Sequence, residues 1–153
     1  MGDSRRHRVF ARFIRRQFGR KASTILVVAD GKGELARALA NKGFRVRVVE
    51  AKPRFSGRGH KRIQYTAGWF DESAPVPEDV IVAMHPDEAT GEVVLAAKRL
   101  RKPFAVVPCC IKGKLSSGVG SFAGWVNKLM AAHGNCRRAV LKGMNGKNVV
   151  IYG

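Results

Sequence analysis

Two segments of the sequence carry side chains that could perform acid–base, nucleophilic or metal chemistry. His85 and Asp87 directly follow one apolar run, and Cys109 and Cys110 directly follow another. If both runs are neighbouring parallel strands, their carboxyl ends meet at one edge of a sheet and bring the four side chains together. We therefore predict His85, Asp87, Cys109 and Cys110 as catalytic residues.

Several roles are open to this cluster. A cysteine thiolate could add to the sixth carbon of a pyrimidine ring, and the imidazole of His85 could take a proton from an acceptor. His85 with Asp87 or the cysteines could instead hold zinc, although adjacent cysteines form a poor chelate, and we predict no metal. The cysteines could equally be small apolar side chains in a pocket wall, and His85 could simply hydrogen-bond a loop.

A second feature is a glycine turn followed by an acid at a fixed spacing. Gly31 and Gly33 follow a β-branched apolar run, and Glu50 ends the next one, 19 positions after Gly31. Such a turn lets backbone amides approach a ligand, and an acid at this spacing accepts hydrogen bonds from ribose hydroxyls. With Ala36 the turn also satisfies the GxGxxA dinucleotide pattern, so a nicotinamide cofactor is an alternative.

Apolar periodicity places these residues on alternating strands and helices. The predicted strands are residues 24–29, 45–50, 63–66, 80–84, 104–107, 139–142 and 148–152, the last two joined through Asn145-Gly146. The predicted helices lie between Gly33 and Gly43, at residues 88–100 behind an Asp87 cap, and at residues 121–132, and residues 67–79 form a loop. This order predicts an α/β fold with a mainly parallel sheet and one antiparallel strand.

The first residues form a separate amphipathic pattern. Phe10, Phe13, Ile14 and Phe18 have helical spacing, arginines stand between them, and Gly19 is the expected stop. We predict a basic N-terminal helix within residues 1–22 and one globular domain at residues 23–153. The helix could pack on the core with one side facing RNA, or serve as an organelle-targeting segment.

Charge is distributed very unevenly. The 153 residues include 29 Lys plus Arg against 11 Asp plus Glu, a formal charge of +18, and the last 61 residues hold no acid. Such a field attracts polyanions, and RNA is the partner that we predict. Near residue 60, cations alternate with Phe55, His60, Tyr65 and Trp69, a composition suited to stacking bases. The predicted nucleic-acid contacts are Arg54, Arg58, Lys61, Arg62, Lys112 and Lys114.

Composition excludes several classes of protein. With 45% hydrophobic residues the chain can form a core, so we do not expect disorder. We expect no membrane-spanning segment, because no apolar run approaches about 20 residues. Three cysteines cannot form a conventional disulfide framework, so we expect a cytoplasmic, or at least intracellular and reducing, location.

Two longer motifs carry a family resemblance. The run VVADGKGELARALANKGFRVRVVE at residues 27–50 resembles the first motif and second strand of Rossmann-like (class I) S-adenosylmethionine-dependent methyltransferases. HPDEAT at residues 85–90 and KPFAVVPCC at residues 102–110 resemble a narrower, poorly characterised methyltransferase-like branch. Val27 and Ala29 stand where the family usually has an acid and an additional glycine.

The resemblance implies a doubly wound, three-layer α/β/α sandwich of about seven strands with a C-terminal antiparallel hairpin. It implies S-adenosylmethionine as cofactor, with binding residues Ala29, Asp30, Gly31, Gly33, Glu50, Gly68, Trp69, Asp71 and His85. The predicted function is methyl transfer to RNA, rRNA or tRNA. The alternatives are a noncatalytic RNA-binding or assembly protein with this fold and a nicotinamide-dinucleotide-binding protein. A homodimer or a partner protein could add specificity.

Overall fold

A single seven-stranded sheet organises the computed structural model, which describes residues 5–54 and 59–153. The strand order is β3-β2-β1-β4-β5-β7-β6. Neighbours from β3 to β5 run parallel, whereas β7 is antiparallel to both β5 and β6. The strands are β1 (Thr24–Val28), β2 (Arg45–Glu50), β3 (Ile63–Ala67), β4 (Val80–Met84), β5 (Phe104–Val107), β6 (Arg137–Val140) and β7 (Val149–Tyr152).

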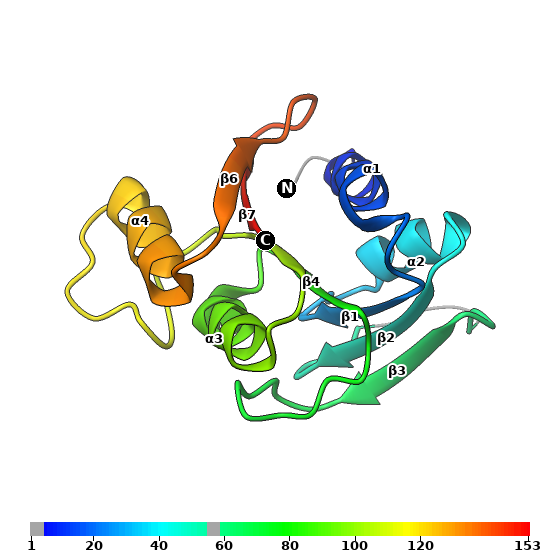
Figure 1. Cartoon of the computed structure of the whole chain (residues 1–153). Helices are drawn as coiled ribbons and strands as arrows, with labels where there is room; N and C mark the ends of the chain where they lie inside the picture. Colours follow the sequence, from blue (N-terminus) through cyan, green and yellow to red (C-terminus); the bar gives the residue numbers. More distant parts are fainter. Residues whose placement is uncertain (1–4, 55–58) are drawn as a thin grey trace.

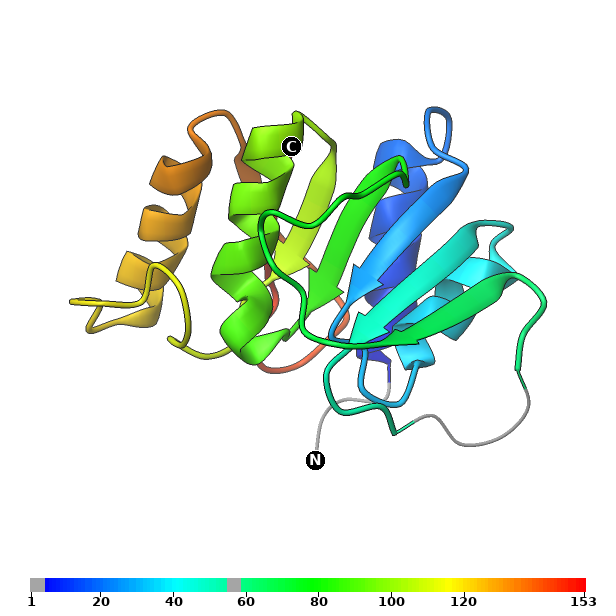
Figure 2. The same cartoon turned by 90° about the horizontal axis from the view of Figure 1, so that it is seen from below.

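Helices cover both faces of the sheet. α1 (Arg6–Phe18) and α2 (Glu34–Asn41) lie on one face, and α3 (Thr90–Leu100) and α4 (Phe122–His133) lie on the other (Figures 1 and 2). Along β1, Ile25 and Val27 join the first cluster while Leu26 and Val28 join the second. This two-sided burial explains why the strand is apolar without alternation. The predicted doubly wound, three-layer α/β/α fold is confirmed.

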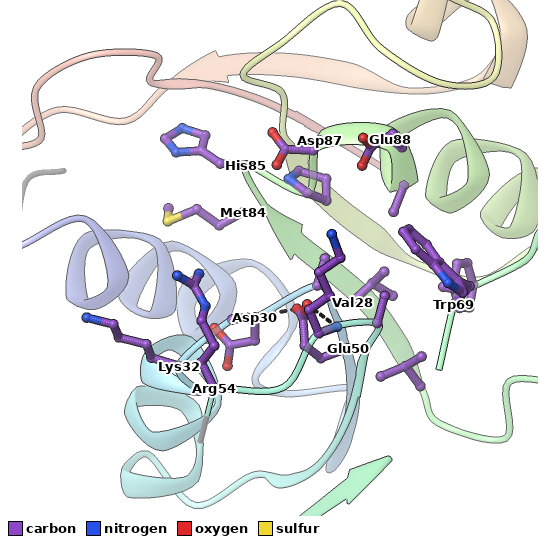
Figure 3. A pocket seen from close by; sticks show the side chains of 18 of the residues that line it. Val28, Asp30, Lys32, Glu50, Arg54, Trp69, Met84, His85, Asp87 and Glu88 are labelled. Atoms are coloured by element: carbon purple, nitrogen blue, oxygen red, sulfur yellow. Dashed lines mark hydrogen bonds between the residues drawn. The ribbon is translucent and has the colours of Figure 1, made fainter. Parts of the chain in front are cut away.

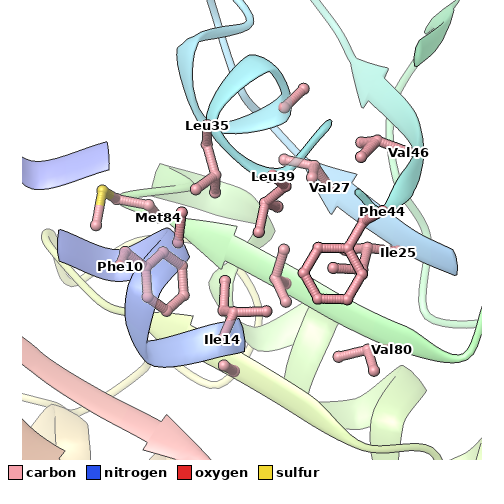
Figure 4. Close-up of a cluster of buried hydrophobic side chains, with 14 of the residues drawn as sticks. Phe10, Ile14, Ile25, Val27, Leu35, Leu39, Phe44, Val46, Val80 and Met84 are labelled. Carbon is pink, nitrogen blue, oxygen red and sulfur yellow. The ribbon is translucent and has the colours of Figure 1, made fainter. Parts of the chain in front are cut away.

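The N-terminal helix is an integral part of one core. Phe10 and Ile14 are fully buried between the sheet and α2, beside Leu39 (Figure 4). Phe13, on the same side of the helix, packs edge-to-face on Tyr152 of β7, with ring centroids 5.1 Å apart. Since burying one large apolar side chain contributes about 1.5–3 kcal/mol, α1 stabilises the sheet that it covers.

The start of α3 differs from its prediction. A 3-10 turn, η1 (Asp87–Ala89), precedes the helix, whose N-cap is Ala89 with no side-chain cap hydrogen bond. Asp87 has a φ of +52° and directs its carboxylate to Cys109, so the predicted cap is wrong. At α4 the N-cap is Ser121, which accepts a hydrogen bond from Gly124 N.

The strand order creates a switch point at the centre of the sheet. From β1 the chain winds outward through β2 and β3, then returns to place β4 and β5 on the other side of β1. Connections therefore diverge at the carboxyl ends of β1 and β4, which is where ligands bind in such sheets. No helix in the part of the chain that the structure describes is long and apolar enough to cross a membrane.

Candidate functional site

A cavity of about 890 Å³ opens at this switch point. Its walls come from the carboxyl ends of β1, β2 and β4, from the three residues after β3, and from the first turn of α1. Figure 3 shows Asp30, Glu50 and Arg54 on one side and His85, Asp87 and Glu88 across from them. The volume is in the range of small-molecule and cofactor sites.

The turn after β1 uses left-handed backbone at three positions. Ala29, Gly31 and Gly33 have φ values of +61°, +57° and +81°. Ala29 thus adopts a glycine-like conformation without being glycine, held by a hydrogen bond from its N–H to Val49 O at 2.8 Å. Arg54 lies against the turn, and its guanidinium would be 3.1 Å from a Cβ at Gly31. The left-handed φ of Gly31 favours glycine at that position.

Glu50 closes the cavity floor beside this turn. Its Oε2 accepts a hydrogen bond from Gly31 N at 2.8 Å, and its Oε1 accepts one from Lys52 N at 3.0 Å. The two bonds orient the carboxylate at the end of β2. Each oxygen has a second lone pair that can accept a ligand hydroxyl.

Asp30 has a structural task as well as a place in the cavity wall. Its carboxylate accepts hydrogen bonds from Leu35 N at 3.1 Å and Ala36 N at 2.8 Å, which satisfies free N–H groups at the start of α2. Burial nevertheless raises the pKa of Asp30 to about 7, against the opposing effect of these two bonds. Its protonation state therefore changes near neutral pH.

His85 lines the cavity with its ring tied to the terminal hairpin. Its backbone φ is +49°, and its Nε2 is 2.9 Å from Lys147 O. A carbonyl can only accept, so Nε2 donates, and in the neutral ring Nδ1 is the accepting nitrogen. Burial lowers the pKa of His85, and the hydrogen bond to the Lys147 carbonyl raises it by a smaller amount. The net lowering of the pKa favours the neutral ring.

The two predicted thiols lie beside the cavity and do not line it. Cys109 Sγ donates to Asp87 Oδ1 at 3.3 Å. Burial, together with bonds to the Asp87 and Cys110 side chains, raises the pKa of Cys109 to about 12. Free Cys109 is thus a thiol, a weak nucleophile. The structure brings Asp87, Cys109 and Cys110 together, and His85 points toward Lys147 instead.

The remaining predicted cofactor residues divide into two groups. Gly68 and Trp69 line the cavity, and the Trp69 indole stands at the rim with 71% of its surface exposed. Gly33 is the N-cap of α2 and does not line the cavity. Asp71 is also outside it, where its carboxylate accepts hydrogen bonds from the N–H and hydroxyl of Ser73. Their binding roles stay predictions.

The predicted nucleic-acid residues do not form one patch. Arg54 is in the cavity wall at the carboxyl ends of the strands, while Arg62 donates to Gly43 O at 3.2 Å, at the amino ends of β2 and β3. Lys114 lies on another side of the molecule, where its Nζ is 2.6 Å from Glu72 and 3.6 Å from a Glu92 oxygen. Lys61 and Lys112 are exposed, and Arg58 falls outside the described residues.

Several cavity residues were missed by the sequence reasoning. Arg6 and His7 reach the cavity from α1, and His7 Nε2 is 2.8 Å from Glu34 Oε2. Lys32 and Lys52 line it as well. Lys32 could have been predicted at the site, because it lies inside the glycine turn. Arg6 and His7 reach the cavity only because of how α1 packs on the sheet, and local sequence does not predict that packing.

Comparisons with known proteins bear on the fold. Neither a scan of family models nor a search of curated proteins gave a match. A protein described as a methyltransferase of an antibiotic biosynthesis pathway from Anabaena variabilis has a similar structure, with a TM-score of 0.60 and 17% sequence identity. The match covers 88% of this chain and 66% of that protein, so this chain spans just under two thirds of its length.

Two further solved structures match over more of their length. A protein described as an S-adenosylmethionine-dependent methyltransferase from Methanococcus maripaludis has a TM-score of 0.60 and 14% identity, over 95% of this chain and 83% of its own. An amino pentose methyltransferase of calicheamicin biosynthesis from Micromonospora echinaspora, solved with S-adenosylmethionine bound, has a TM-score of 0.63 and 12% identity, over 96% and 89%. The chain thus has the fold of class I S-adenosylmethionine-dependent methyltransferases.

Proposed function

We propose that this protein binds S-adenosylmethionine in the cavity and transfers its methyl group. The main observation behind the proposal is the contact between Glu50 and the glycine turn, in which Glu50 Oε2 accepts a hydrogen bond from Gly31 N at 2.8 Å. This contact lies at the carboxyl ends of the strands, in a sheet with the strand order of such nucleotide-binding folds. An acid held there can accept hydrogen bonds from both hydroxyls of a ribose. Trp69 at the rim offers a face on which an adenine could stack.

The charge of the cavity supports the same ligand. Among the described residues, five acids line it, in a chain with a formal charge of +18: Asp30, Glu34, Glu50, Asp87 and Glu88. The proposed cofactor carries a sulfonium and an ammonium group against one carboxylate, so acids near its cationic end would favour binding, while Lys32 or Arg54 could pair with the carboxylate.

Little catalytic machinery is needed for the transfer. The bound cofactor would supply a reactive, electrophilic methyl group, so positioning of the acceptor provides much of the acceleration. The chain's own contribution would be His85, whose Nδ1 can take the acceptor's proton while Nε2 stays bound to Lys147 O. Its lowered pKa keeps the ring unprotonated and ready to accept.

Isothermal titration with S-adenosylhomocysteine, with NAD in parallel, tests the proposal. We expect affinity for S-adenosylhomocysteine to exceed that for NAD by well over tenfold, about 1.4 kcal/mol or more. Preference for NAD would favour a nicotinamide protein, and no binding of either would favour a noncatalytic protein. Either result would refute the proposed function.

We further propose that the acceptor is RNA held along α1. The outer face of this helix exposes Arg8, Arg12 and Arg16, and its first turn contributes Arg6 to the cavity wall. Arg137 of β6 is exposed and lies on the same side of the sheet as α1, because its strand partner Tyr152 packs on Phe13. A phosphate backbone on this face would lead to the cavity mouth.

A salt series on RNA binding tests this second step. Fluorescence anisotropy with a labelled RNA hairpin should show that replacing Arg12 and Arg16 with Glu weakens binding, and that affinity falls with salt by a slope of about 0.7–0.9 per phosphate contact. Replacing the exposed Lys98 and Arg101 with Glu, on the α3 side of the sheet, changes the charge by the same amount and is the matched control. Equal affinity of the two variants would contradict an RNA path along α1.

A further inference from the structure

Asp87, Cys109 and Cys110 form a cluster of three potential metal ligands at the edge of the cavity. One ligand atom of each residue lies within 4.8 Å of the other two, and Cys109 Sγ is 3.3 Å from Asp87 Oδ1. In a tetrahedral site with Zn–S of about 2.3 Å and Zn–O of about 2.0–2.2 Å, neighbouring ligand atoms are about 3.3–3.8 Å apart. Only a small side-chain adjustment separates the observed cluster from this geometry.

Backbone packing holds the two ligand-bearing segments together. A Cβ at Gly113 would lie 2.3 Å from the carbonyl oxygen of Glu88, and Glu88 directly follows Asp87. A Cβ at Gly91 would lie 2.2 Å from Lys114 O. The loop after Cys110 therefore packs backbone to backbone on the start of α3, at an approach that only glycine permits. Such support fixes ligands before an ion arrives, which lowers the cost of binding.

The donor set selects the kind of ion. Two sulfurs and one carboxylate oxygen suit zinc, whereas magnesium and calcium prefer oxygen alone. All three side chains have solvent access, and Asp87 also lines the cavity, so an ion has a route to the cluster. His85, the other ligand considered from the sequence, is bound to Lys147 O.

We propose that Asp87, Cys109 and Cys110 bind one zinc ion, with the fourth position left for water or for a ligand in the cavity. The two thiols would lose their protons to solvent as the Zn–S bonds form, so binding is a ligand exchange without oxidation. Adjacent cysteines alone make a poor chelate. Asp87, from the neighbouring strand end, supplies the third bond. The zinc proposal does not rest on methyl transfer, although Asp87 also lines the cavity.

Cobalt titration of the 153-residue protein tests the site. The protein is treated with chelator under a non-thiol reductant, and Co²⁺ is added as a spectroscopic substitute for zinc. We expect one Co²⁺ per chain with sulfur-to-cobalt charge-transfer absorption, displacement of Co²⁺ by Zn²⁺, and release of about two protons per ion. The absence of thiolate absorption would overturn the proposal.

Variants identify the ligands. Asp87→Asn should weaken binding by at least about tenfold, as loss of a ligand costs no less than loss of its supporting partner. Cys109→Ser with Cys110→Ser should abolish the charge-transfer absorption, while Cys136→Ser should leave it unchanged, because Cys136 Sγ lies elsewhere, against Met130 O. Absorption that persists in the double variant, or unchanged affinity in Asp87→Asn, would overturn the assignment.

A second readout does not require the variants to fold. In the unmodified protein, Zn²⁺ should protect Cys109 and Cys110 from alkylation by iodoacetamide and leave Cys136 as reactive as before. Peptide mass spectrometry assigns the label to each cysteine. Equal labelling of the adjacent pair with and without Zn²⁺ would refute the site.

Discussion

Replacement of Glu50 by alanine is the most direct test of the proposed cofactor site. In the free protein its carboxylate accepts hydrogen bonds from Gly31 N and Lys52 N at 2.8 and 3.0 Å. Bound ribose hydroxyls would donate to the remaining lone pairs. Alanine removes these acceptors and also releases the turn that approaches the ligand.

The expected loss can be estimated from the number of bonds. Hydrogen bonds to a charged group contribute about 1.5–3 kcal/mol each at most, and water replaces part of this in the variant, so we expect a net loss of about 1 to 3 kcal/mol. That loss corresponds to about 5- to 150-fold weaker binding. The free energy of unfolding should change by less than about 1 kcal/mol, because Gly31 and Lys52 line the open cavity, where water can satisfy their N–H groups.

The assay is isothermal titration of S-adenosylhomocysteine into both proteins, with urea unfolding as the measure of fold stability. Glu72→Ala is the matched control, since Glu72 pairs with Lys114 outside the cavity. Unchanged affinity in Glu50→Ala would remove Glu50 from the site. An equal loss in Glu72→Ala would show that general charge, and no specific contact, determines binding.

Three further predictions concern stacking, pH and packing. Trp69→Ala should weaken S-adenosylhomocysteine binding by about 1–3 kcal/mol if the exposed indole stacks on the adenine, with no change in melting temperature; unchanged affinity would exclude stacking. The raised pKa of Asp30 means that the folded state binds more protons than the unfolded state between about pH 4 and pH 7. In urea titrations, the free energy of unfolding should therefore fall as pH rises through this range, by at most about 1.4 kcal/mol per pH unit. Asp30→Asn should remove this slope. Phe10→Ala should destabilise the protein by about 3–5 kcal/mol in urea unfolding, and a negligible effect would contradict α1 as part of the core.

The elements of the sheet could be predicted because they are strongly patterned. The predicted bounds of β2, β4 and β5 are those of the structure. β4 lies between Asp79 and His85, β5 lies between two prolines, and β2 is a valine-rich segment that begins shortly after the Gly43 turn. The hairpin strands begin or end up to two residues from their predicted positions. There, residues 137–140 are mostly exposed, so burial does not mark the strand in the sequence.

The site was less predictable because backbone conformation and docking decide it. Asp87 looked like a helix cap from its place before an apolar stripe, but its left-handed φ turns the carboxylate toward Cys109. Ala29 departs from the usual glycine and still adopts the glycine-like conformation. Neither fact follows from local propensity, because packing of the neighbouring strands determines both.

The confinement of acids to the middle of the sequence has a structural reason. Outside the cavity, the described acids hold neighbouring groups: Asp79 accepts from the N–H groups of Ser23 and Thr24, and Glu78 binds Arg47 at 2.8 Å. Glu72 and Glu92 pair with Lys114, and Asp71 accepts from Ser73. The other described acids line the cavity. Acids and cations thus share the cavity lining, whereas the outer face of α1 exposes Arg8, Arg12 and Arg16. Under the proposed function, a polyanion would be held on the outer face of α1 and a cationic nucleoside in the cavity, and only an uncharged base of the polyanion would need to enter it.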